Sequence, residues 1–317
     1  MESARYPYLY YWPAVFLYKL FYFTDIFVRV YVIRLWSLIL FLGTVAFSLK
    51  IGKLIFPKDK LSFVTLAILV GFQPMMIFSN VGVNSDALGN FLFTLFLYLS
   101  VKLLILGPSK NYFIFLILIS ILSIYSKPQF IIILPLVLLL LLWMILREFL
   151  KNRKRKTLIY LIFMILFLTL GSYVFRANMI TFTQFLAKVN LPSLSKYTRE
   201  YTISHTISEV LPWYWGIYDW LGVTYPRIVH RIINRLVIIA GIGVLIGLIR
   251  IIRNHGWKRK ENQAILFLNI VAVSYFIAIS FYDWLLWFTS KYPLGVQGRY
   301  FFPLISVTML MLLIWFK

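Results

Sequence analysis

The chain has 317 residues and no cysteine, and its 32 Lys and Arg residues against 10 Asp and Glu residues give a net charge of +22. Hydrophobic residues make up 62% of the sequence and charged residues 13%, against roughly 45–50% and roughly 25% in soluble globular domains. So few charges cannot cover a water-facing surface, which excludes a water-soluble enzyme. The sequence therefore predicts an all-α, multi-pass helix bundle in which residues 1–317 form one integral membrane domain.

The N-terminal segment, residues 1–31, places aromatic side chains beside Lys19, Asp25 and Arg29. A segment that mixes Tyr, Trp and Phe with charges is typical of a helix in the membrane interface, with an aromatic belt at the level of the headgroups. We expect this interfacial helix to start near Pro13. A simple membrane anchor explains the segment equally well.

Apolar runs long enough to cross a bilayer recur along the rest of the chain. A helix needs about 20 apolar residues to cross a hydrocarbon core of ~30 Å. By this measure the sequence predicts about nine spans, of which the fourth is short enough for a re-entrant segment. We expect a turn at residues 127–129, because proline disfavours helix at the residue before it. The nine spans cover residues 32–49, 61–82, 87–106, 112–126, 129–147, 157–175, 236–252, 263–282 and 300–316.

Lys and Arg gather in three loops, between spans one and two, between five and six, and after span seven. With nine spans these loops fall on one side, which the positive-inside rule makes cytoplasmic. The other side receives residues 1–31, a large loop of residues 176–235 and seven of the ten acids, so we expect the functional face to be extracytoplasmic. Because the basic residues separate apolar runs and do not line a polar face, they indicate membrane lipids as partners and no nucleic acid.

The first candidate site follows Pro74 in span two, where the sequence reads SNVGVNSDALGN. Asn84 and Asp86 lie at the expected start of the third span, where polar side chains cap a helix and its dipole favours a carboxylate. That is one explanation of Asp86. The other makes Asp86 a ligand of a sugar, a metal or a cation in an outward cleft that a bend at Pro74 opens.

Cationic side chains supply further candidates. Lys127 interrupts an apolar stretch, which favours a functional role, although snorkelling to the outer interface is a competing explanation. Arg227, Arg231 and Arg235 are spaced by four residues and share one helical face. Because guanidinium groups bind phosphate oxygens through paired hydrogen bonds, this face suits a lipid phosphate. Interfacial anchoring accounts for it about as well.

The large outer loop combines aromatic residues with acids. Trp213, Trp215 and Asp219 lie in the stretch PWYWGIYDWLG. Rings beside carboxylates are what binding of a carbohydrate or a lipid headgroup requires, since rings stack on apolar faces and acids accept hydroxyl protons. Aromatic residues of a membrane belt explain the stretch equally well.

A last polar motif precedes the final span. The stretch GVQGRYFFPL contains Gln297, Arg299 and Tyr300 at the outward end of that span. An arginine buried at a helix start beside an apolar wall is costly unless it meets an anion. Arg299 is therefore a candidate anion-binding residue.

Four motifs carry a resemblance to a known family. VNSDALGN, YSKPQF, WYWGIYDWLGVTYP and GVQGRYFFPL resemble the predicted membrane proteins of the domain of unknown function 2142 family, and QGRYFFP is the most specific piece. The likeness spans nearly the whole chain. That group is similar to the GT-C superfamily of membrane glycosyltransferases, and the opening RYPYLYYWP resembles the PPLYY element of those enzymes.

The resemblance implies a GT-C-type glycosyltransferase that moves a hexosyl or pentosyl group from a polyprenyl-phosphate donor to an acceptor at the outer face of the cell membrane. It implies inversion at the anomeric carbon, with a carboxylate as the base and cations stabilising the lipid phosphate. On this basis Asp86 is the candidate base. The donor phosphate is assigned to Arg299, Lys127, Arg227, Arg231 and Arg235, and the acceptor or sugar to Asn84, Trp213, Trp215, Asp219, Gln297 and Tyr300.

The sequence departs from the GT-C pattern in one respect. Those enzymes usually hold the catalytic carboxylate in a first outer loop after an initial span, and this sequence begins downstream of both, so we expect a fragment or a protein without the usual base. The sequence identifies no cofactor. His205, Glu209 and Asp219 lack the spacing of a known metal site, so the sequence does not decide whether a divalent metal binds. A lipid or small-anion transporter, or a non-catalytic membrane scaffold, would also need outward cations and broken helices.

Overall fold

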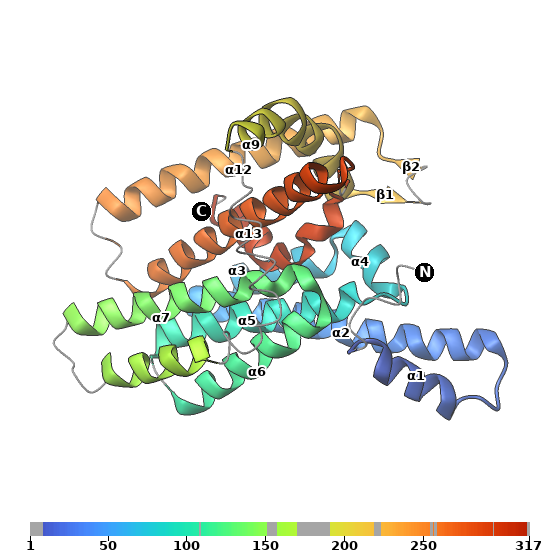
Figure 1. Ribbon diagram of the computed structural model, residues 1–317, viewed down its shortest axis with the longest axis horizontal. Coiled ribbons are helices and arrows are strands. Elements are labelled where there is room, and N and C mark those ends of the chain that lie inside the picture. Colours follow the sequence, from blue (N-terminus) through green and yellow to red (C-terminus); the bar gives the residue numbers. More distant parts are fainter. Residues whose placement is uncertain are drawn as a thin grey trace.

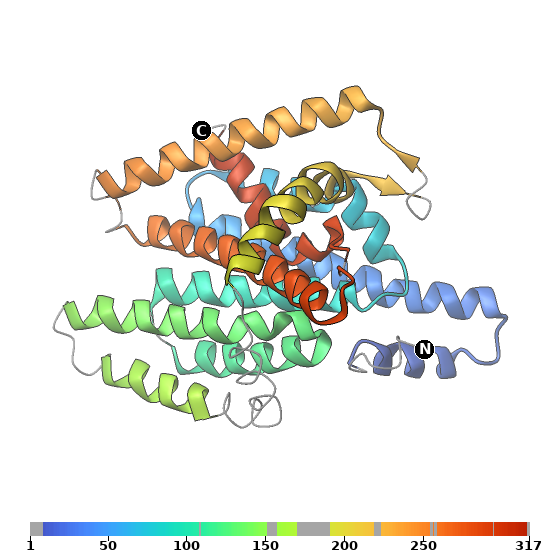
Figure 2. The same ribbon diagram turned by 45° about the horizontal axis from the view of Figure 1, so that its top comes forward.

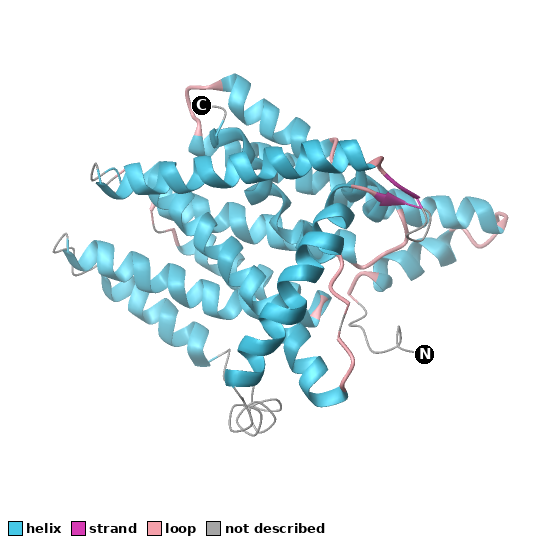
Figure 3. Ribbon diagram, turned by 90° about the horizontal axis from the view of Figure 1, so that it is seen from above, coloured by secondary structure: helices cyan, strands magenta, loops and turns pink. Residues whose placement is uncertain are grey.

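The computed structural model describes residues 9–107, 109–150, 157–169, 191–218, 223–253, 256, 259–293 and 295–315. Within these ranges the chain is almost entirely helical (Figure 1), which confirms the all-α membrane-protein class. The exception is a short antiparallel ribbon of two strands, visible in magenta in Figure 3, in which Ile217 pairs with Thr224.

Five helices are long and apolar enough to cross a membrane, or six if one bent pair is counted as a span. The bent pair is α3 (Lys60–Gly71) with α4 (Pro74–Val81), which meet at 55°. The predicted count of nine spans is not confirmed, because three of the predicted spans correspond to apolar helices of 10–17 residues. The five long helices are α2 (Ile26–Ile55), α5 (Asp86–Leu106), Gln129–Phe149, α12 (Arg227–Arg253) and α13 (Lys260–Ser290), and the short ones are α6 (Lys110–Ser126), Thr157–Thr169 and Gly298–Ile314.

The remaining elements are short. Within the predicted outer loop, described residues 191–215 form one bent helical segment in which two stretches, η3 and η4, are π-helical, whereas η2 and η6 are 3-10 helices. These elements are α1 (Tyr11–Leu20), η2 (Pro128–Ile132), α7 (Ile133–Leu150), α9 (Leu191–Tyr197), η3 (Thr198–Thr202), α10 (Ile203–His205), η4 (Thr206–Val210), α11 (Leu211–Trp215), β1 (Ile217–Tyr218), β2 (Val223–Thr224), η6 (Gly298–Leu304) and α14 (Ile305–Trp315).

Helix α5 is the centre of the bundle. Most of its residues are buried, and it packs against α2, α6, α13 and η6. Aromatic rings fill the space around it: the ring of Phe93 has its centroid 5.6 Å from those of both Phe96 and Phe130. Helix α12 is the opposite case, since it runs along one side of the molecule, packs against α14 and buries few residues (Figure 2).

Prolines interrupt the helices at the two places that the sequence predicts. Pro74 is the first residue of α4, and the side-chain oxygen of Gln73 accepts the backbone N–H of Met76, so the predicted bend is present. Helix α6 ends at Ser126 and η2 begins at Pro128, so the chain also turns at residues 127–129. Both breaks lie at the same end of the bundle as the start of α5 (Figure 1).

The N-terminal helix α1 begins at Tyr11, slightly before the predicted start, and folds back along the first turns of α2 (Figure 1). Asp25 begins α2 by accepting the backbone N–H of Phe27 at 2.7 Å. The guanidinium carbon of Arg29 lies 4.3 Å from the ring centroid of Tyr22. This hairpin projects from the bundle, and its placement in the membrane interface stays a prediction.

Candidate functional site

Asp86 and Lys127 form a buried ion pair. Their side chains are 6% and 13% exposed, and the ammonium contacts the carboxylate directly. Asp86 is the first residue of α5, and Lys127 lies between α6 and η2, outside both helices. The breaks in the helices thus bring together two candidates that are 41 residues apart in the sequence.

Asn84 holds the Asp86 carboxylate from the loop between α4 and α5. Its side-chain Nδ2 donates to Asp86 Oδ2 at 3.2 Å, and its Oδ1 accepts the backbone N–H of Asp86 at 3.0 Å. The backbone N–H of Asn84 donates to the hydroxyl of Tyr10 at 3.2 Å, and that hydroxyl lies 2.6 Å from Ser37 Oγ. Contacts from the N-terminal segment and α2 therefore fix the loop that precedes Asp86.

Arg299 brings a second positive charge to this pair. Burial and then the charge of Arg299 lower the pKa of Lys127, whereas the Asp86 carboxylate in contact with it acts in the opposite direction. The Nε atom of Arg299 is buried and has no hydrogen-bond partner in the described part of the chain. The site thus holds two cations and one carboxylate, and the Nε–H of Arg299 is an unused donor among the described residues. We call Asp86, Lys127 and Arg299 the ionic centre.

Helix η6, which carries Arg299, is held against α11 by a glycine. A Cβ atom on Gly298 would lie only 2.6 Å from the backbone carbonyl carbon of Trp213. The backbone of α11 is fixed in turn, because the carbonyl oxygen of Tyr214 accepts a hydrogen bond from the side chain of Gln73. The close approach of η6 and α11 therefore depends on the absence of a side chain at residue 298.

Tyr275 on α13 links the two sides of the ionic centre. Its hydroxyl donates to the carbonyl oxygen of Tyr300 at 3.0 Å and accepts from Nε2 of Gln129 at 3.0 Å. Tyr300 follows Arg299 in the chain, and Gln129 lies two residues after Lys127. Sequence analysis did not identify Tyr275, because nothing in an apolar span marks which tyrosine meets these two motifs.

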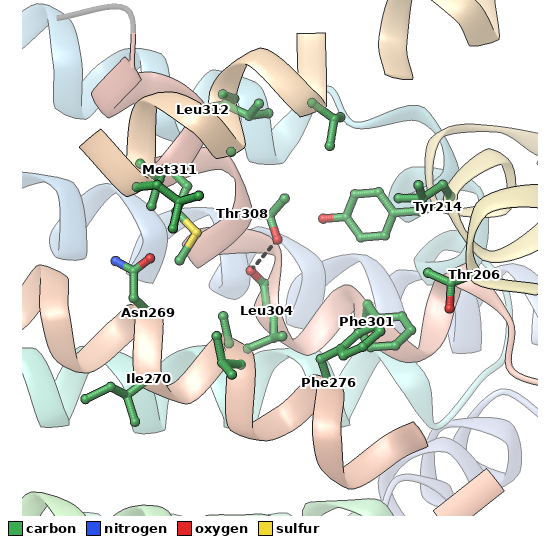
Figure 4. A pocket seen from close by; sticks show the side chains of 18 of the residues that line it. Thr206, Tyr214, Asn269, Ile270, Phe276, Phe301, Leu304, Thr308, Met311 and Leu312 are labelled. Carbon is green, nitrogen blue, oxygen red and sulfur yellow. Dashed lines mark hydrogen bonds between the residues drawn. The ribbon is translucent and has the colours of Figure 1, made fainter. Parts of the chain in front are cut away.

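An apolar pocket of about 650 Å³ opens beside η6, between α11, α12, α13 and α14 (Figure 4). Such a volume is typical of ligand pockets. Phe301 and Leu304 of η6 line it, and the hydroxyl of Tyr214 points into it toward Thr308 (Figure 4). Because η6 carries both Arg299 and these lining residues, the ionic centre and the apolar pocket adjoin each other.

The apolar space continues beyond this pocket. A second pocket of about 430 Å³ lies between α13 and the helical segment of residues 191–207, and it shares Thr206 and Phe276 with the first. Its lining is apolar apart from a few hydroxyl groups, including that of Ser280. The two pockets together suit a long hydrocarbon chain better than a compact polar molecule.

Polar contacts that sequence analysis missed tie the segment of residues 191–215 to the bundle. The hydroxyl of Tyr197 donates to Asp283 Oδ2 at 2.8 Å. The Nε2 atom of His205 lies 3.0 Å from the carbonyl oxygen of Val296, and its Nδ1 lies 3.4 Å from a carboxylate oxygen of Glu209. Asp283 and Val296 are distant from this segment in the sequence, so no spacing could reveal their contacts, whereas Glu209 follows His205 by four residues within the segment.

The structure separates the other candidates from the ionic centre or leaves them at its edge. Arg227, Arg231 and Arg235 are exposed on α12 and make no described contact with the ionic centre.

The remaining candidates lie near η6 or outside the described part of the chain. Trp215 lines the apolar pocket. At the start of η6, the backbone N–H of Tyr300 donates to the carbonyl oxygen of Gln297 at 3.0 Å. Asp219 lies outside the described residues. Within the described residues, no three His, Asp or Glu side chains are grouped as a metal site would need.

The fold and the site define a multi-pass helical membrane protein with a buried ionic centre beside an apolar pocket. Residues 1–308 match the family described as "Predicted membrane protein (DUF2142)", and the chain therefore belongs to this family, as its motifs indicate. No curated protein and no solved structure matches the chain.

Proposed function

We propose that this membrane protein is a GT-C-type glycosyltransferase, which transfers a sugar from a polyprenyl-phosphate donor to an acceptor at the extracytoplasmic face of the membrane. The observation that carries the proposal is the ionic centre, where the buried Nε of Arg299 has no partner among the described residues and the charge of Arg299 lowers the pKa of Lys127, which is paired with Asp86. Two cations with one carboxylate leave room for one more negative charge, and a phosphate supplies it.

The adjoining pocket supports a lipid-linked donor. Phosphate bound at Arg299 would lie beside η6, and Phe301 and Leu304 of the same helix line the apolar pocket. A polyprenyl chain is apolar and long, so it fits a pocket that continues into a second apolar space past Thr206 and Phe276. In this proposal the charged and apolar parts of the donor bind on two sides of one short helix.

The proposed chemical step uses Asp86 as the base. The donor phosphate binds between Lys127 and Arg299 and competes with Asp86 for the Lys127 ammonium. The freed carboxylate takes the proton of the acceptor hydroxyl as the acceptor oxygen attacks the anomeric carbon. The bond from that carbon to the phosphate oxygen breaks, and polyprenyl phosphate leaves with the electron pair, stabilised by the two cations. Attack from the face opposite the phosphate inverts the anomeric carbon.

The acceptor or sugar would contact residues around the ionic centre. Asn84 already holds Asp86, and Trp213 and Trp215 lie on α11, which packs on η6. Gln297 and Tyr300 flank Arg299 along the chain, and we also assign Asp219 to this side. The exposed face of Arg227, Arg231 and Arg235 is a second, alternative contact for the lipid phosphate. The proposal does not specify whether a divalent metal takes part.

The experiment that tests the proposal supplies the purified protein, in liposomes, with polyprenyl monophosphates linked to several hexoses and pentoses. We expect release of free polyprenyl phosphate with one of them, and loss of the release in Arg299→Ala and Lys127→Met. The control is Arg250→Ala, which removes an exposed charge at the far end of α12.

Three outcomes separate the alternatives. Movement of the lipid across the liposome membrane without its consumption would indicate a lipid or small-anion transporter. Absence of both transfer and movement would indicate a non-catalytic membrane scaffold. The enzymatic proposal fails if no donor is consumed and Arg299→Ala binds polyprenyl phosphate as tightly as the unmodified protein.

A further inference from the structure

At the far end of α5 from Asp86, two lysines share one aromatic cluster. The Nζ atom of Lys50 on α2 lies 4.5 Å from the ring centroid of Phe47 and 6.0 Å from that of Tyr98. The Nζ atom of Lys102 on α5 lies 5.4 Å from the Tyr98 centroid and 4.2 Å from that of Tyr112 on α6. The contacts of α2, α5 and α6 therefore bring two ammonium groups to the same ring.

The charge of this cluster is not balanced by protein. Among the described residues, no carboxylate lies within ion-pair distance of Lys50 or Lys102. The rings attract the ammonium groups through their negative faces, but they carry no net charge. Two positive charges beside the ring of Tyr98 therefore give this end of the bundle a local positive potential that attracts an anion.

The depth of the cluster indicates where that anion comes from. Lys102 lies four residues before the end of α5, and Lys50 lies five residues before the end of α2. At a rise of about 1.5 Å per residue, both lie roughly 6–8 Å inside the helix ends. Lysines and tyrosines at this depth reach the level of the lipid headgroups. The same end of the bundle carries Lys58, in the loop after α2, and Lys60, the first residue of α3.

We propose that Lys50, Lys102 and the rings of Phe47, Tyr98 and Tyr112 form a binding site for the phosphate headgroup of an anionic phospholipid. The two ammonium groups contact the phosphate from α2 and α5, and the rings contact the glycerol and the first methylene groups. The ligand belongs to the leaflet at the basic end of the bundle. The site is separate from the ionic centre and does not depend on sugar transfer.

The test titrates the purified protein in detergent with phosphatidylglycerol or with phosphatidylcholine of the same acyl chains, and counts bound lipids by native mass spectrometry. We expect the protein to retain one phosphatidylglycerol that phosphatidylcholine does not displace. The double variant Lys50→Gln/Lys102→Gln should bind it roughly tenfold more weakly, because both contacts to the phosphate lose their charge. Tyr98→Leu, which keeps both charges, should also weaken retention.

The matched control is Lys53→Gln/Lys110→Gln, which removes the same charge from the same end of α2 and from the start of α6. Both lysines are exposed and contact no ring in the described part of the chain. The proposal is overturned if the two double variants lose phosphatidylglycerol equally, since the attraction would then be general. It is also overturned if Lys50→Gln/Lys102→Gln retains the lipid fully, or if inorganic phosphate displaces it, which would indicate a site for free phosphate.

Discussion

Gly298 of η6 lies directly against the backbone of Tyr214 in α11, with no space for a side chain between them: a Cβ atom on the glycine would come 2.6 Å from the Tyr214 Cα. The GVQGRYFFPL motif and the WYW motif are therefore parts of one packing unit. Arg299 follows the glycine, so the position of its guanidinium depends on this contact.

The variant Gly298→Ala should push η6 away from α11 and displace Arg299. Overpacking of this kind costs on the order of 1–3 kcal/mol. We expect a lower melting temperature in detergent and weaker binding of polyprenyl phosphate. Gly247→Ala on α12 is the control, because a Cβ there meets nothing within 4 Å. Equal effects of the two variants would contradict the packing argument.

Substitutions of the two partners in the buried Asp86–Lys127 pair should have coupled effects on stability. Lys127→Met or Asp86→Asn alone leaves an unpaired charge and should cost about 3–5 kcal/mol. The double variant should cost clearly less than the sum of the two. The free energy of unfolding in mixed micelles measures this coupling. Additive effects would mean that the two side chains do not interact.

A large side chain in the apolar pocket should block the lipid chain and leave the ionic centre intact. Gly241 lines the pocket, and a Cβ there meets nothing within 4 Å, so Gly241→Phe has room to fill it. We expect weaker binding of long polyprenyl phosphates and unchanged binding of a short, water-soluble alkyl phosphate. Gly247→Phe, on the same helix and outside the pocket lining, is the control. Loss of both ligands in Gly241→Phe would show that the two sites are not separable.

Tyr275→Phe removes the hydroxyl that joins Gln129 to the carbonyl oxygen of Tyr300. Both partners are then left unsatisfied, which should lower the free energy of unfolding by about 1–3 kcal/mol. Tyr292→Phe is the matched control, because that ring is 77% exposed. Calorimetry in detergent compares the two variants. An unchanged melting temperature for Tyr275→Phe would show that the bridge contributes nothing.

The orientation of the chain can be tested directly because it has no cysteine. Val83, in the loop before Asp86, is 41% exposed, and Lys58 is exposed at the other end of the bundle. In intact cells, a membrane-impermeant maleimide should label Val83→Cys and leave Lys58→Cys unlabelled until the cells are lysed. The reverse pattern would place the ionic centre on the cytoplasmic side and remove the proposed donor.

The residues of the ionic centre could be predicted from the sequence, but their contacts could not. Lys127 and Arg299 stand out because an ionisable side chain beside apolar residues is costly unless it has a partner, and Asp86 stands out as a carboxylate in a polar motif at the start of a span. Nothing in the spacing says which of them meet, because that depends on how α5, η2 and η6 pack. A tyrosine in an apolar span has no comparable energetic cost, so the sequence gave no reason to select Tyr275.

The number of membrane spans was the part of the fold that the sequence predicted less well. Hydropathy detects apolar runs, but it does not say whether a run forms a helix long enough to cross the membrane or a shorter one, as in α6 and α14. Pro74 and Pro128 did mark real breaks, since proline acts on the local backbone whatever surrounds it. The three arginines of α12 show that a regular spacing indicates a shared face but not what that face meets.

Gln73 closes the bend between α3 and α4 with its side-chain oxygen and holds the carbonyl of Tyr214 with its side-chain amide. Gln73 therefore connects the bend between α3 and α4 to α11, the helix that packs against η6. A tilt of α11 would carry α4 with it and, through the short loop that follows, would shift Asp86 at the same time as Arg299. Admission of a ligand and alignment of the charges would then be a single movement.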